Sequence, residues 1–497
     1  MQLICISNQS KLELEKLENS STAWTTCQSC KGLGKKSRKL SKKALLCYQL
    51  ACDEFEKTKK EENPPIKPKV EHYSCTNCAG SGLISSENIP IPDKENYPHV
   101  AIIGAGIGGV ALAVACLHRR IPFTLYERDK SFSDRSQGYG LTLQQASKAI
   151  KSFGIISLKE GVVSTKHIVH NTDGKVVGEW GMRKWLPSET KTSPKKTNMH
   201  ISRQSLRLEL LKQLGVEDKV QWGHQLLDFK DSENNGIDLS FQVNGKIKTK
   251  KADLVVGADG IRSSVRKLLI GEDKTPLRYL DCIVILGICP LSALENMDSP
   301  LLDSATVFQT ANGNERIYMM PYDSNSIMWQ LSFPMSEIDA KELSTKGPKF
   351  LKEEACRRTQ WHAPIPQILV ATLETQISGY PVYDRELLSS ESLDKGKNIT
   401  LIGDAAHPMS PFKGQGANQA LLDALNLARE ITKKCKPSSN WREIGIRKSV
   451  LTDFESEMLA RSATKVKDSA DAAKFLHSEM ALHKGDEPRG SLIKRNK

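Results

Sequence analysis

The chain has 497 residues, and at roughly 100 to 200 residues per domain this length predicts about three structural units. Hydrophobic residues make up 39% and charged residues 26%, a composition that excludes collagen-like and wholly disordered chains and favours a globular protein. Lysine and arginine total 71 against 58 for aspartate and glutamate. The resulting net charge of +13 favours contact with an anion, whether a phosphate-bearing cofactor, nucleic acid or a lipid surface.

The sequence contains no apolar run near the roughly 20 residues that cross a bilayer, so we expect no membrane span. The first sixteen residues carry lysine and glutamate where a secretory signal would be apolar, which favours a cytoplasmic protein. Of the twelve cysteines, four form two CxxC pairs, and five others are scattered in apolar or helical surroundings. The first group indicates a metal site, and the second indicates buried thiols in a reducing compartment.

Residues 1–96 are predicted to be a cysteine-rich appendage and linker, because lysine runs and prolines take the place of apolar periodicity there. Within it, residues 27–34 and 75–82 both fit the pattern CxxCxGxG. This spacing lets two thiolates hold one tetrahedral ion, and the glycines permit the turn that directs backbone N–H groups at sulfur.

Both segments resemble half of the cysteine-rich zinc domain of the DnaJ chaperones. The resemblance implies one zinc ion held by Cys27, Cys30, Cys75 and Cys78. Between the two segments lies a 44-residue insertion that contains Cys47 and Cys52, so the ligand set stays open, and a metal-free or redox-active pair is the alternative. The appendage would serve either to dock a protein partner or to stabilise itself.

A βαβ unit is predicted to open the main part of the chain. Residues 99–103 are a short apolar run that glycine ends, which is typical of a buried parallel strand. Residues 109–120 are rich in alanine, valine and leucine and predict a helix, and residues 123–126 predict a second strand.

Three glycines between the first strand and the helix complete the pattern GxGxxG. Gly104 permits a tight turn, Gly106 lets the backbone approach a pyrophosphate, and Gly109 allows the helix to pack closely on the strand. Glu127 ends the second strand 23 positions after Gly104, where a ribose-binding carboxylate belongs. Strand, helix and acid together predict dinucleotide binding.

Two further apolar strands, residues 254–260 and 401–408, also break into turns that carry aspartate. Asp404 at the carboxyl end of the second can accept hydrogen bonds from sugar or ribityl hydroxyls. Gly414 and Gly416 open a helix N-terminus to negative charge. Each break alone is also explained by an Asx-turn or a helix cap, but three such breaks at strand ends favour a nucleotide site.

The middle of the chain is predicted to be a β-sheet domain, because residues 282–288, 316–320 and 327–333 are strand-like and carry aromatic residues. Their aromatic and soft side chains are candidates for a substrate pocket, although sheet core is the commoner role for each one alone. These candidates are Tyr318, Met320, Met328, Trp329 and Phe333. A long amphipathic helix is predicted from about residue 450 to 479, followed by a basic tail.

Together these motifs resemble the group A FAD-dependent aromatic monooxygenases, the family of para-hydroxybenzoate hydroxylase and the tetracycline-inactivating hydroxylases. The resemblance covers about residues 97–460. It implies an α/β fold in which a Rossmann-like FAD-binding domain is interleaved with the strands of a β-sheet substrate domain. The predicted divisions are 97–278 and 376–445 for the FAD-binding domain, 279–375 for the substrate domain, and 446–497 for the C-terminal helix and tail.

The resemblance also implies which residues contact FAD, and it places residues 137–140 near the isoalloxazine ring. The implied contacts are Gly104, Gly106, Gly109, Glu127, Arg128, Gly138, Arg203, Asp259, Asp404, Pro411, Gly414, Gly416 and Asn418. Arg266 completes the second of the three motifs.

A second GxGxxG after a strand is not found in the sequence, so NAD(P)H is expected to visit the same cleft as a co-substrate. In this family hydride reduces the flavin, molecular oxygen adds to form a flavin hydroperoxide, and its terminal oxygen passes to an aromatic or polycyclic small molecule. The sequence has no GxSxG or HExxH. His200 and His407 could handle a substrate proton, but neither is assigned as a catalytic base.

Two alternatives stay open. The first is a flavoprotein reductase, halogenase or dehydrogenase on the same fold, although the Trp-x-Trp-x-Ile-Pro element of halogenases is absent. The second is a zinc-knuckle binding protein with a vestigial flavin domain. Complete FAD motifs argue against it, and the spread of basic residues without interleaved aromatics means that no nucleic-acid partner is expected.

Overall fold

The computed structural model describes residues 23–38, 40–57, 65, 68, 72–134, 138–181, 198–215, 219–232, 236–294, 297–436 and 438–488. The chain divides into two compact units, Met1–Ile91 and Pro92–Lys497. The division lies in the proline cluster that precedes the first predicted strand of the main part. Gln137 and residues 489–497 of the predicted tail lie outside the described residues.

The first unit places its two CxxCxGxG segments between short strands. Strand β1 (Ala23–Thr26) pairs antiparallel with β4 (Leu83–Ser86), and β2 (Lys35–Ser37) pairs antiparallel with β3 (His72–Ser74). One cysteine segment joins β1 to β2 and the other joins β3 to β4, so the two ladders hold the segments together. Helix α2 (Lys42–Lys57) buries no residue.

A five-stranded parallel sheet forms the centre of the second unit, with the strand order β12-β6-β5-β16-β22. Its strands are β5 (Val100–Ile103), β6 (Phe123–Tyr126), β12 (Val220–Gln221), β16 (Leu254–Gly257) and β22 (Ile399–Leu401). All residues of β5, β16 and β22 are buried, which explains why they are continuous apolar runs in the sequence.

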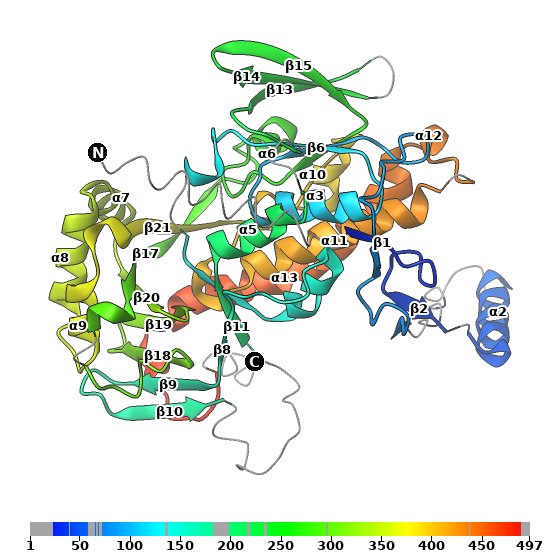
Figure 1. Cartoon of the computed structure of the whole chain (residues 1–497). Coiled ribbons are helices and arrows are strands. Elements are labelled where there is room, and N and C mark those ends of the chain that lie inside the picture. Colours follow the sequence, from blue (N-terminus) through cyan, green and yellow to red (C-terminus); the bar gives the residue numbers. More distant parts are fainter. Residues whose placement is uncertain are drawn as a thin grey trace. The chain divides into compact units, whose positions relative to one another are not determined.

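The helices next to this sheet are long and largely buried. Eleven of the twelve residues of α3 (Ile107–His118) are buried, and α3 contacts α11 (Gly416–Lys434). Helix α13 (Thr452–Phe475) also contacts α11, and the three helices lie near one another in Figure 1. One hydrophobic cluster joins these helices to the parallel sheet. The remaining helices of this part are α5 (Arg203–Lys212), α6 (Ser264–Ile270), α10 (Ser390–Asp394) and α12 (Trp441–Ile444).

A seven-stranded sheet forms the second layer, with the order β10-β9-β18-β19-β20-β17-β21. Its strands are β9 (Lys166–His170), β10 (Val176–Trp180), β17 (Leu277–Pro290), β18 (Thr306–Ala311), β19 (Arg316–Asp323), β20 (Ser326–Pro334) and β21 (Ile377–Arg385). Three helices cover one of its faces, as Figure 1 shows: α7 (Glu337–Thr345), α8 (Pro348–Arg358) and α9 (Ile365–Ala371). The opposite face is therefore left to line a cavity.

Two smaller antiparallel sheets complete the second unit. One has the order β7-β11-β8, formed by β7 (Gly140–Leu143), β8 (Val162–Ser164) and β11 (Asn198–Ser202). The other is formed in chain order by β13 (Gln225–Asp231), β14 (Ile237–Val243) and β15 (Lys246–Ala252).

The predicted α/β fold class, with a β-sheet layer and a small cysteine-rich appendage, is confirmed. Helix α3 begins at Ile107, two residues before the predicted start, because Gly108 and Gly109 lie inside its first turn. The long C-terminal helix is present as Thr452–Phe475.

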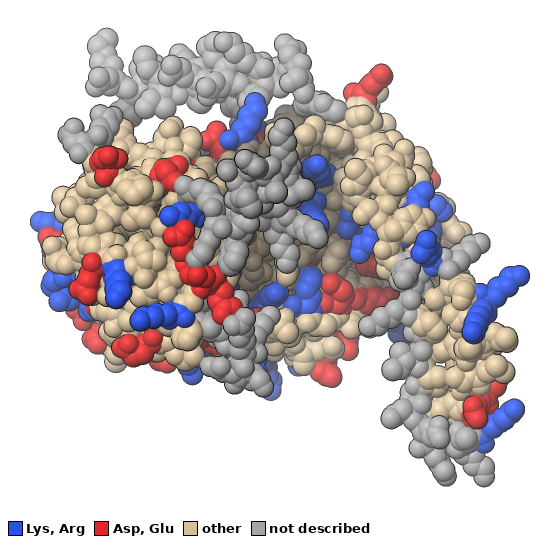
Figure 2. All heavy atoms as spheres, turned by 90° about the horizontal axis from the view of Figure 1, so that it is seen from below, with Lys and Arg blue, Asp and Glu red and all other residues tan. Residues whose placement is uncertain are grey.

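Basic and acidic side chains are interspersed on the face of the molecule that Figure 2 shows, and several lysines and arginines lie around a hollow in that face. Among the described residues, no helix is long and apolar enough to cross a membrane.

Candidate functional site

The GxGxxG turn follows β5 and forms the N-terminus of α3. Gly104 has a φ of 102°, and a Cβ on Gly109 would lie 1.8 Å from the carbonyl oxygen of Gly104. Gly106 is the N-cap of α3 and leaves its first N–H groups without a side-chain cap. The nearest non-neighbouring atom of the described residues to a Cβ built on Gly106 is Nη2 of Arg203, at 3.9 Å. The turn is therefore open to an anion at the end of an uncapped helix.

Glu127, at the end of β6, supports this turn. Its Oε2 accepts a hydrogen bond from the backbone N–H of Ala105 at 2.7 Å, and its Oε1 accepts one from Asp129 at 3.1 Å. The side chain is buried at the position predicted for a ribose-binding carboxylate. Arg128 is exposed and makes no hydrogen bond or ion pair with the described residues.

Arg203 brings the end of β11 to the same turn. Its backbone N–H donates to the carbonyl oxygen of Tyr139 at 3.1 Å. A Cβ on Gly138 would lie 2.9 Å from Cβ of Arg203, so glycine permits this close approach. The guanidinium of Arg203 has no hydrogen-bond partner among the described residues, and it faces Gly106. This cation is thus available to a ligand at the glycine turn.

The second motif is placed against the first, but its aspartate is engaged. A Cβ on Gly104 would lie 2.7 Å from Cα of Asp259, so the two turns are in close contact. The Asp259 carboxylate accepts hydrogen bonds from the hydroxyl of Ser263 and from the backbone of Ser264 at 2.6 Å. It caps helix α6, which was the alternative noted for this residue, and its contact with a cofactor stays a prediction.

Arg266 links the second motif to the third. This buried side chain donates from Nη1 to the carbonyl oxygens of Ala405 and Ala406, both at 3.0 Å. The third motif therefore depends on an arginine about 140 residues earlier in the chain.

The third motif lines a cavity. Asp404 is exposed to it, and Oδ1 of Asp404 lies 3.4 Å from the position of a Cβ on Gly416. Pro411 and Gly414 line the same cavity, and Gly414 adopts a φ of 58°. Helix α11 begins at Gly416 without a side-chain cap, so its N-terminus is open to an anion.

Asn418 positions this loop rather than facing the cavity. Its Oδ1 accepts from the backbone N–H groups of Gln144 and Ala146 at 2.9 and 3.1 Å. Its Nδ2 donates to the carbonyl oxygens of Thr142 and Gly414, both at 2.9 Å. All hydrogen-bonding atoms of this buried amide are engaged, so a direct contact with a cofactor stays a prediction.

A network of buried charged side chains contacts the third motif and stabilises it. Asp423 accepts hydrogen bonds from Nε2 of His407 at 2.7 Å, from Nη2 of Arg461 at 2.7 Å and from the backbone N–H of Gly403 at 2.9 Å. Burial lowers the pKa of His407, but the Asp423 carboxylate more than offsets this, so the pKa lies above its ordinary value. Arg461 lies on α13, and sequence reasoning missed it because its partners are some 40 residues away.

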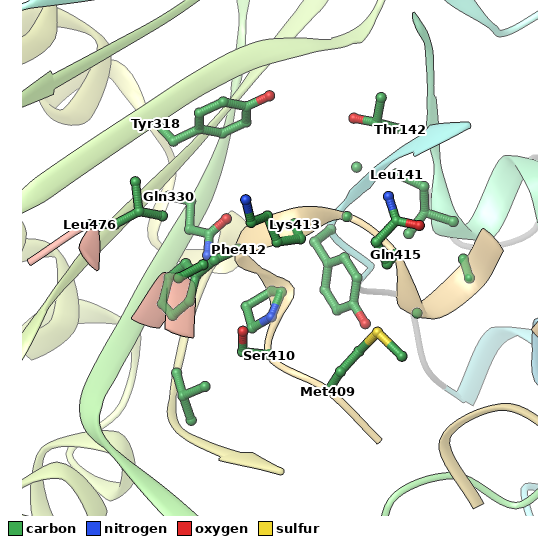
Figure 3. A pocket seen from close by; sticks show the side chains of 18 of the residues that line it. Leu141, Thr142, Tyr318, Gln330, Met409, Ser410, Phe412, Lys413, Gln415 and Leu476 are labelled. Carbon is green, nitrogen blue, oxygen red and sulfur yellow. The ribbon is translucent and has the colours of Figure 1, made fainter. Parts of the chain in front are cut away.

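The cavity has a volume of about 710 Å³ and is lined by segments far apart in the sequence. Figure 3 shows Leu141 and Gln415 on one side and Tyr318 and Gln330 on the other. The first side continues into the glycine-rich loops, and the second is the open face of the seven-stranded sheet. A ligand in the cavity would contact both layers of the second unit.

Successive side chains of a strand point to opposite faces of the sheet, so the predicted pocket residues fall into two groups. Tyr318, Met320 and Met328 line the cavity, as predicted for a pocket. Trp329 and Phe333 are wholly buried on the opposite face, against the covering helices. For these two candidates the commoner role, sheet core, is the one observed, because each lies an odd number of residues from Met328.

Several polar cavity residues were missed by sequence reasoning. His167 stacks on Trp180, with ring centres 5.4 Å apart, and Arg316 is buried in the sheet face. His200, which the sequence indicates as able to handle a substrate proton, also lines the cavity, and its Nδ1 shares a hydrogen bond of 3.1 Å with Oγ1 of Thr142. Burial lowers the pKa of His200 to about 3, so it is neutral at physiological pH. These side chains can be identified as neighbours only when it is known which strands pair and which face of the sheet each side chain takes.

The four predicted metal ligands lie together in the first unit. Sγ of Cys27 lies 4.0 Å from Sγ of Cys75, and Sγ of Cys30 lies 3.7 Å from Sγ of Cys78. All four sulfur atoms lie within 4.8 Å of one another. The backbone N–H groups of Gly34 and Gly82 each donate to a cysteine sulfur at 3.2 Å. Cys47 and Cys52 are not part of this cluster.

Comparison with known proteins identifies the class. The family described as FAD binding domain matches residues 97–440, and the chain belongs to this family. The match spans all three motifs, from the glycine turn to helix α11.

One relative in sequence and two solved structures of similar fold extend this result. The chain is 28% identical to the aurachin C monooxygenase/isomerase of Stigmatella aurantiaca over 357 residues, which are 71% of this chain and 86% of that protein. Its fold is similar to Klebsiella pneumoniae HpxO in complex with FAD and uric acid, with a TM-score of 0.62 and 20% identity over 77% of this chain and 90% of that one. It is also similar to 2,6-dihydroxypyridine-3-hydroxylase from Arthrobacter nicotinovorans, with a TM-score of 0.62 and 17% identity over 77% and 93%.

The expected resemblance to FAD-dependent monooxygenases is therefore confirmed by the family match and by this relative in sequence. These relatives do not favour the reductase, halogenase or vestigial-domain alternatives.

Proposed function

We propose that the protein uses NAD(P)H and molecular oxygen to insert one oxygen atom into an aromatic or polycyclic small molecule bound in the cavity. The observation that carries this proposal is the cavity itself, which Asp404 and Gly416 line on one side and Tyr318 and Met328 on the other. Two of the related structures also concern ring compounds, uric acid and 2,6-dihydroxypyridine.

The residues present fit FAD at the glycine turn and the third motif. The uncapped N-terminus of α3 and the unpartnered guanidinium of Arg203 would receive the pyrophosphate, and Glu127 would hold ribose. Asp404 and the N-terminus of α11 would meet the sugar-like chain and the polar ring edge of the flavin. Bound FAD supplies the redox and oxygen chemistry.

The chain's own residues would place the substrate and exclude water from it. Tyr318, Met320 and Met328 provide a flat apolar wall. The neutral imidazole of His200, held by Thr142, would bind a substrate hydroxyl through its Nε2, which has no partner within the described part of the chain. The same walls keep water from the reacting atoms.

The test uses the full chain reconstituted with FAD. NADPH and NADH oxidation is measured alone and with a panel of phenols and polycyclic aromatics, and the products are analysed by mass spectrometry under ¹⁸O₂. We expect slow basal oxidation, stimulation by a ring substrate and one ¹⁸O atom in the product. Label found only in water or peroxide across the panel would refute the proposal.

We propose that Cys27, Cys30, Cys75 and Cys78 bind one zinc ion. With a Zn–S distance of about 2.3 Å, a tetrahedral site has sulfur atoms about 3.8 Å apart, and the two closest pairs here are 3.7 and 4.0 Å apart. The N–H donors of Gly34 and Gly82 would stabilise the thiolates.

Metal analysis tests the zinc proposal. Cys30→Ser should lower the zinc content from about one ion per chain to near zero, because a structural site needs all four ligands. Cys47→Ser is the matched control, since Cys47 is exposed and outside the cluster. Zinc loss of equal size in both variants, or no zinc in the wild-type protein, would contradict the site.

We also propose a cytoplasmic location. Cys116, Cys282 and Cys435 are buried free thiols, which fits a reducing compartment. Fluorescence microscopy of the tagged full-length protein tests this, and an exported protein would contradict it.

A further inference from the structure

Arg316 lies on the sheet face that lines the cavity. Along β19, Arg316, Tyr318 and Met320 line the cavity, while Ile317 and Met319 pack into the core on the other side. Arg316 is 5% exposed, so its long cationic side chain is held inside the protein.

This buried guanidinium has no acidic partner. Its Nε donates to Oε1 of Gln309 at 2.8 Å, and its central carbon lies 4.8 Å from the ring centre of Tyr318. Among the described residues no carboxylate forms an ion pair with it, and its two terminal nitrogens make no hydrogen bond. The two terminal nitrogens of Arg316 are also not among the fully buried polar atoms, so a ligand in the cavity can reach them.

A buried cation with only neutral partners is costly, and it is stabilised when a ligand brings the missing negative charge. Burial lowers the pKa of Arg316 to about 10, so the group is still charged at neutral pH. A guanidinium also offers two parallel N–H donors that match a carboxylate.

A second unsatisfied donor lies on the same face. Nε2 of Gln330 is buried and has no hydrogen-bond partner among the described residues, and the Gln330 side chain lines the cavity. The strand register pairs Gln330 with Tyr318 and Ser332 with Arg316. Arg316 and Gln330 are therefore diagonal neighbours, about 7 to 8 Å apart along the sheet face. Both side chains offer N–H groups and lack an acceptor.

Arg316 lies away from the loop that flanks the candidate flavin site. That loop contacts the other end of the strands, where the backbone N–H of Gly140 donates to Sδ of Met328 at 3.0 Å. A Cβ on Gly140 would lie 2.7 Å from Cε of Met320. Four residues of strand, or about 13 Å, separate Met320 from Arg316. A ligand that reached from this loop to Arg316 would thus place one end near the candidate flavin site and the other end far from it.

We propose that Arg316, assisted by Gln330, is the subsite for an anionic group of the substrate, a carboxylate or an ionised acidic hydroxyl. The inference rests on the proposed function, because it assumes that the cavity receives the substrate. A phosphate of the nicotinamide cofactor is the other anion that could reach this position, and the experiment separates the two.

The probes are 2-naphthoate and its neutral counterpart 2-naphthamide, titrated into the FAD-reconstituted full chain, with the flavin absorbance spectrum as the readout. We expect the acid to bind at least tenfold more tightly than the amide. Arg316→Gln should abolish this preference, and Arg316→Lys should retain part of it. Lys465→Gln removes the same charge from another cavity-lining position, on α13, and should change the preference less than twofold.

Thermal unfolding separates a binding role from a structural one. Arg316→Met should leave the unfolding temperature unchanged or raise it, because it removes an uncompensated buried charge, while the acid-to-amide preference is lost. A lower unfolding temperature with the preference intact would show a structural role and overturn the proposal.

The remaining outcomes are also decisive. A KM for NADPH at least tenfold higher in Arg316→Gln, with the acid preference intact, would assign Arg316 to the cofactor phosphate and overturn the substrate subsite. Equal binding of acid and amide by the wild-type protein refutes the anion subsite alone. If neither probe binds and no ring compound stimulates NADPH oxidation, the proposed function fails as well.

Discussion

Replacing Asp423 with asparagine should weaken both the second unit and its hold on FAD. The side chain is completely buried, and one carboxylate serves Arg461, His407 and the backbone of Gly403. Asparagine has nearly the same shape but no charge, so Arg461 would lose its buried counter-ion and keep only Glu457, whose side chain is 48% exposed. The loop that begins at Gly403 would lose one of its supports.

The expected size follows from the burial. Removing one partner of a buried ion pair costs about 3 to 5 kcal/mol. Asp423 is the buried partner of both His407 and Arg461, so a loss in this range is expected although Arg461 keeps Glu457. Roughly 400 residues with an unfolding entropy of about 2.1 cal/mol/K each give about 0.85 kcal/mol/K. A loss of about 4 kcal/mol therefore lowers the unfolding temperature by about 5 °C.

The assay is thermal unfolding with and without FAD, together with the fraction of FAD retained after gel filtration. Asp453→Asn is the matched control, since Asp453 pairs with Lys434 at 2.8 Å but its side chain is 65% exposed. A surface pair contributes about 1 kcal/mol or less, which corresponds to about 1 °C here. If Asp423→Asn lowers the unfolding temperature no more than Asp453→Asn, the network does not support the loop.

The same network predicts a pH dependence. The pKa of His407 is raised above 6.5, so its contribution to stability is complete below pH 6.5 and is lost as the pH rises through the folded-state value. Burial raises the pKa of Asp423, but His407 and Arg461 bring it below 3.8, so its contribution is lost only at strongly acid pH. The stability difference between wild type and Asp423→Asn should be largest between pH 4 and 6.5. A difference that grows above pH 7 would contradict this reasoning.

Two further substitutions test the turn and the sheet. Gly109→Ala should abolish FAD binding, because its Cβ would meet the carbonyl oxygen of Gly104 at 1.8 Å. Gly108→Ala is the control and should leave FAD binding intact, because the nearest neighbour of its Cβ lies 3.4 Å away. The flavin absorbance of the purified variants measures both. Trp329→Ala should lower the free energy of unfolding by about 3 to 5 kcal/mol through loss of core packing. Tyr318→Ala should instead change the KM for the ring substrate, and the opposite pattern in unfolding and kinetics would contradict the assignment of the two sheet faces.

The motifs around the nucleotide could be predicted from the sequence because their chemistry depends on local geometry. Gly104 must adopt a positive φ, and Gly109 must lack a Cβ, so both requirements appear as glycines at fixed spacing after an apolar strand. The cysteine cluster was predictable for the same reason, since each CxxC supplies two ligands within one turn. The family and the fold class follow from these local signals.

The substrate side could not be predicted in this way, because it depends on which strands pair and which face each side chain takes. Tyr318 and Trp329 have similar sequence surroundings, yet one lines the cavity and the other packs under the helices.

Long-range pairing also decided the roles of single polar residues. Asp259 was expected to face the cofactor, but Ser263 and Ser264 engage it as a helix cap. The roles of Arg316 and Arg461 could not be predicted from the sequence. The groups that surround each guanidinium come from strands and helices that meet only in the folded chain. Local backbone geometry can be predicted from the spacing of residues in the sequence, whereas burial and charge compensation depend on the tertiary structure.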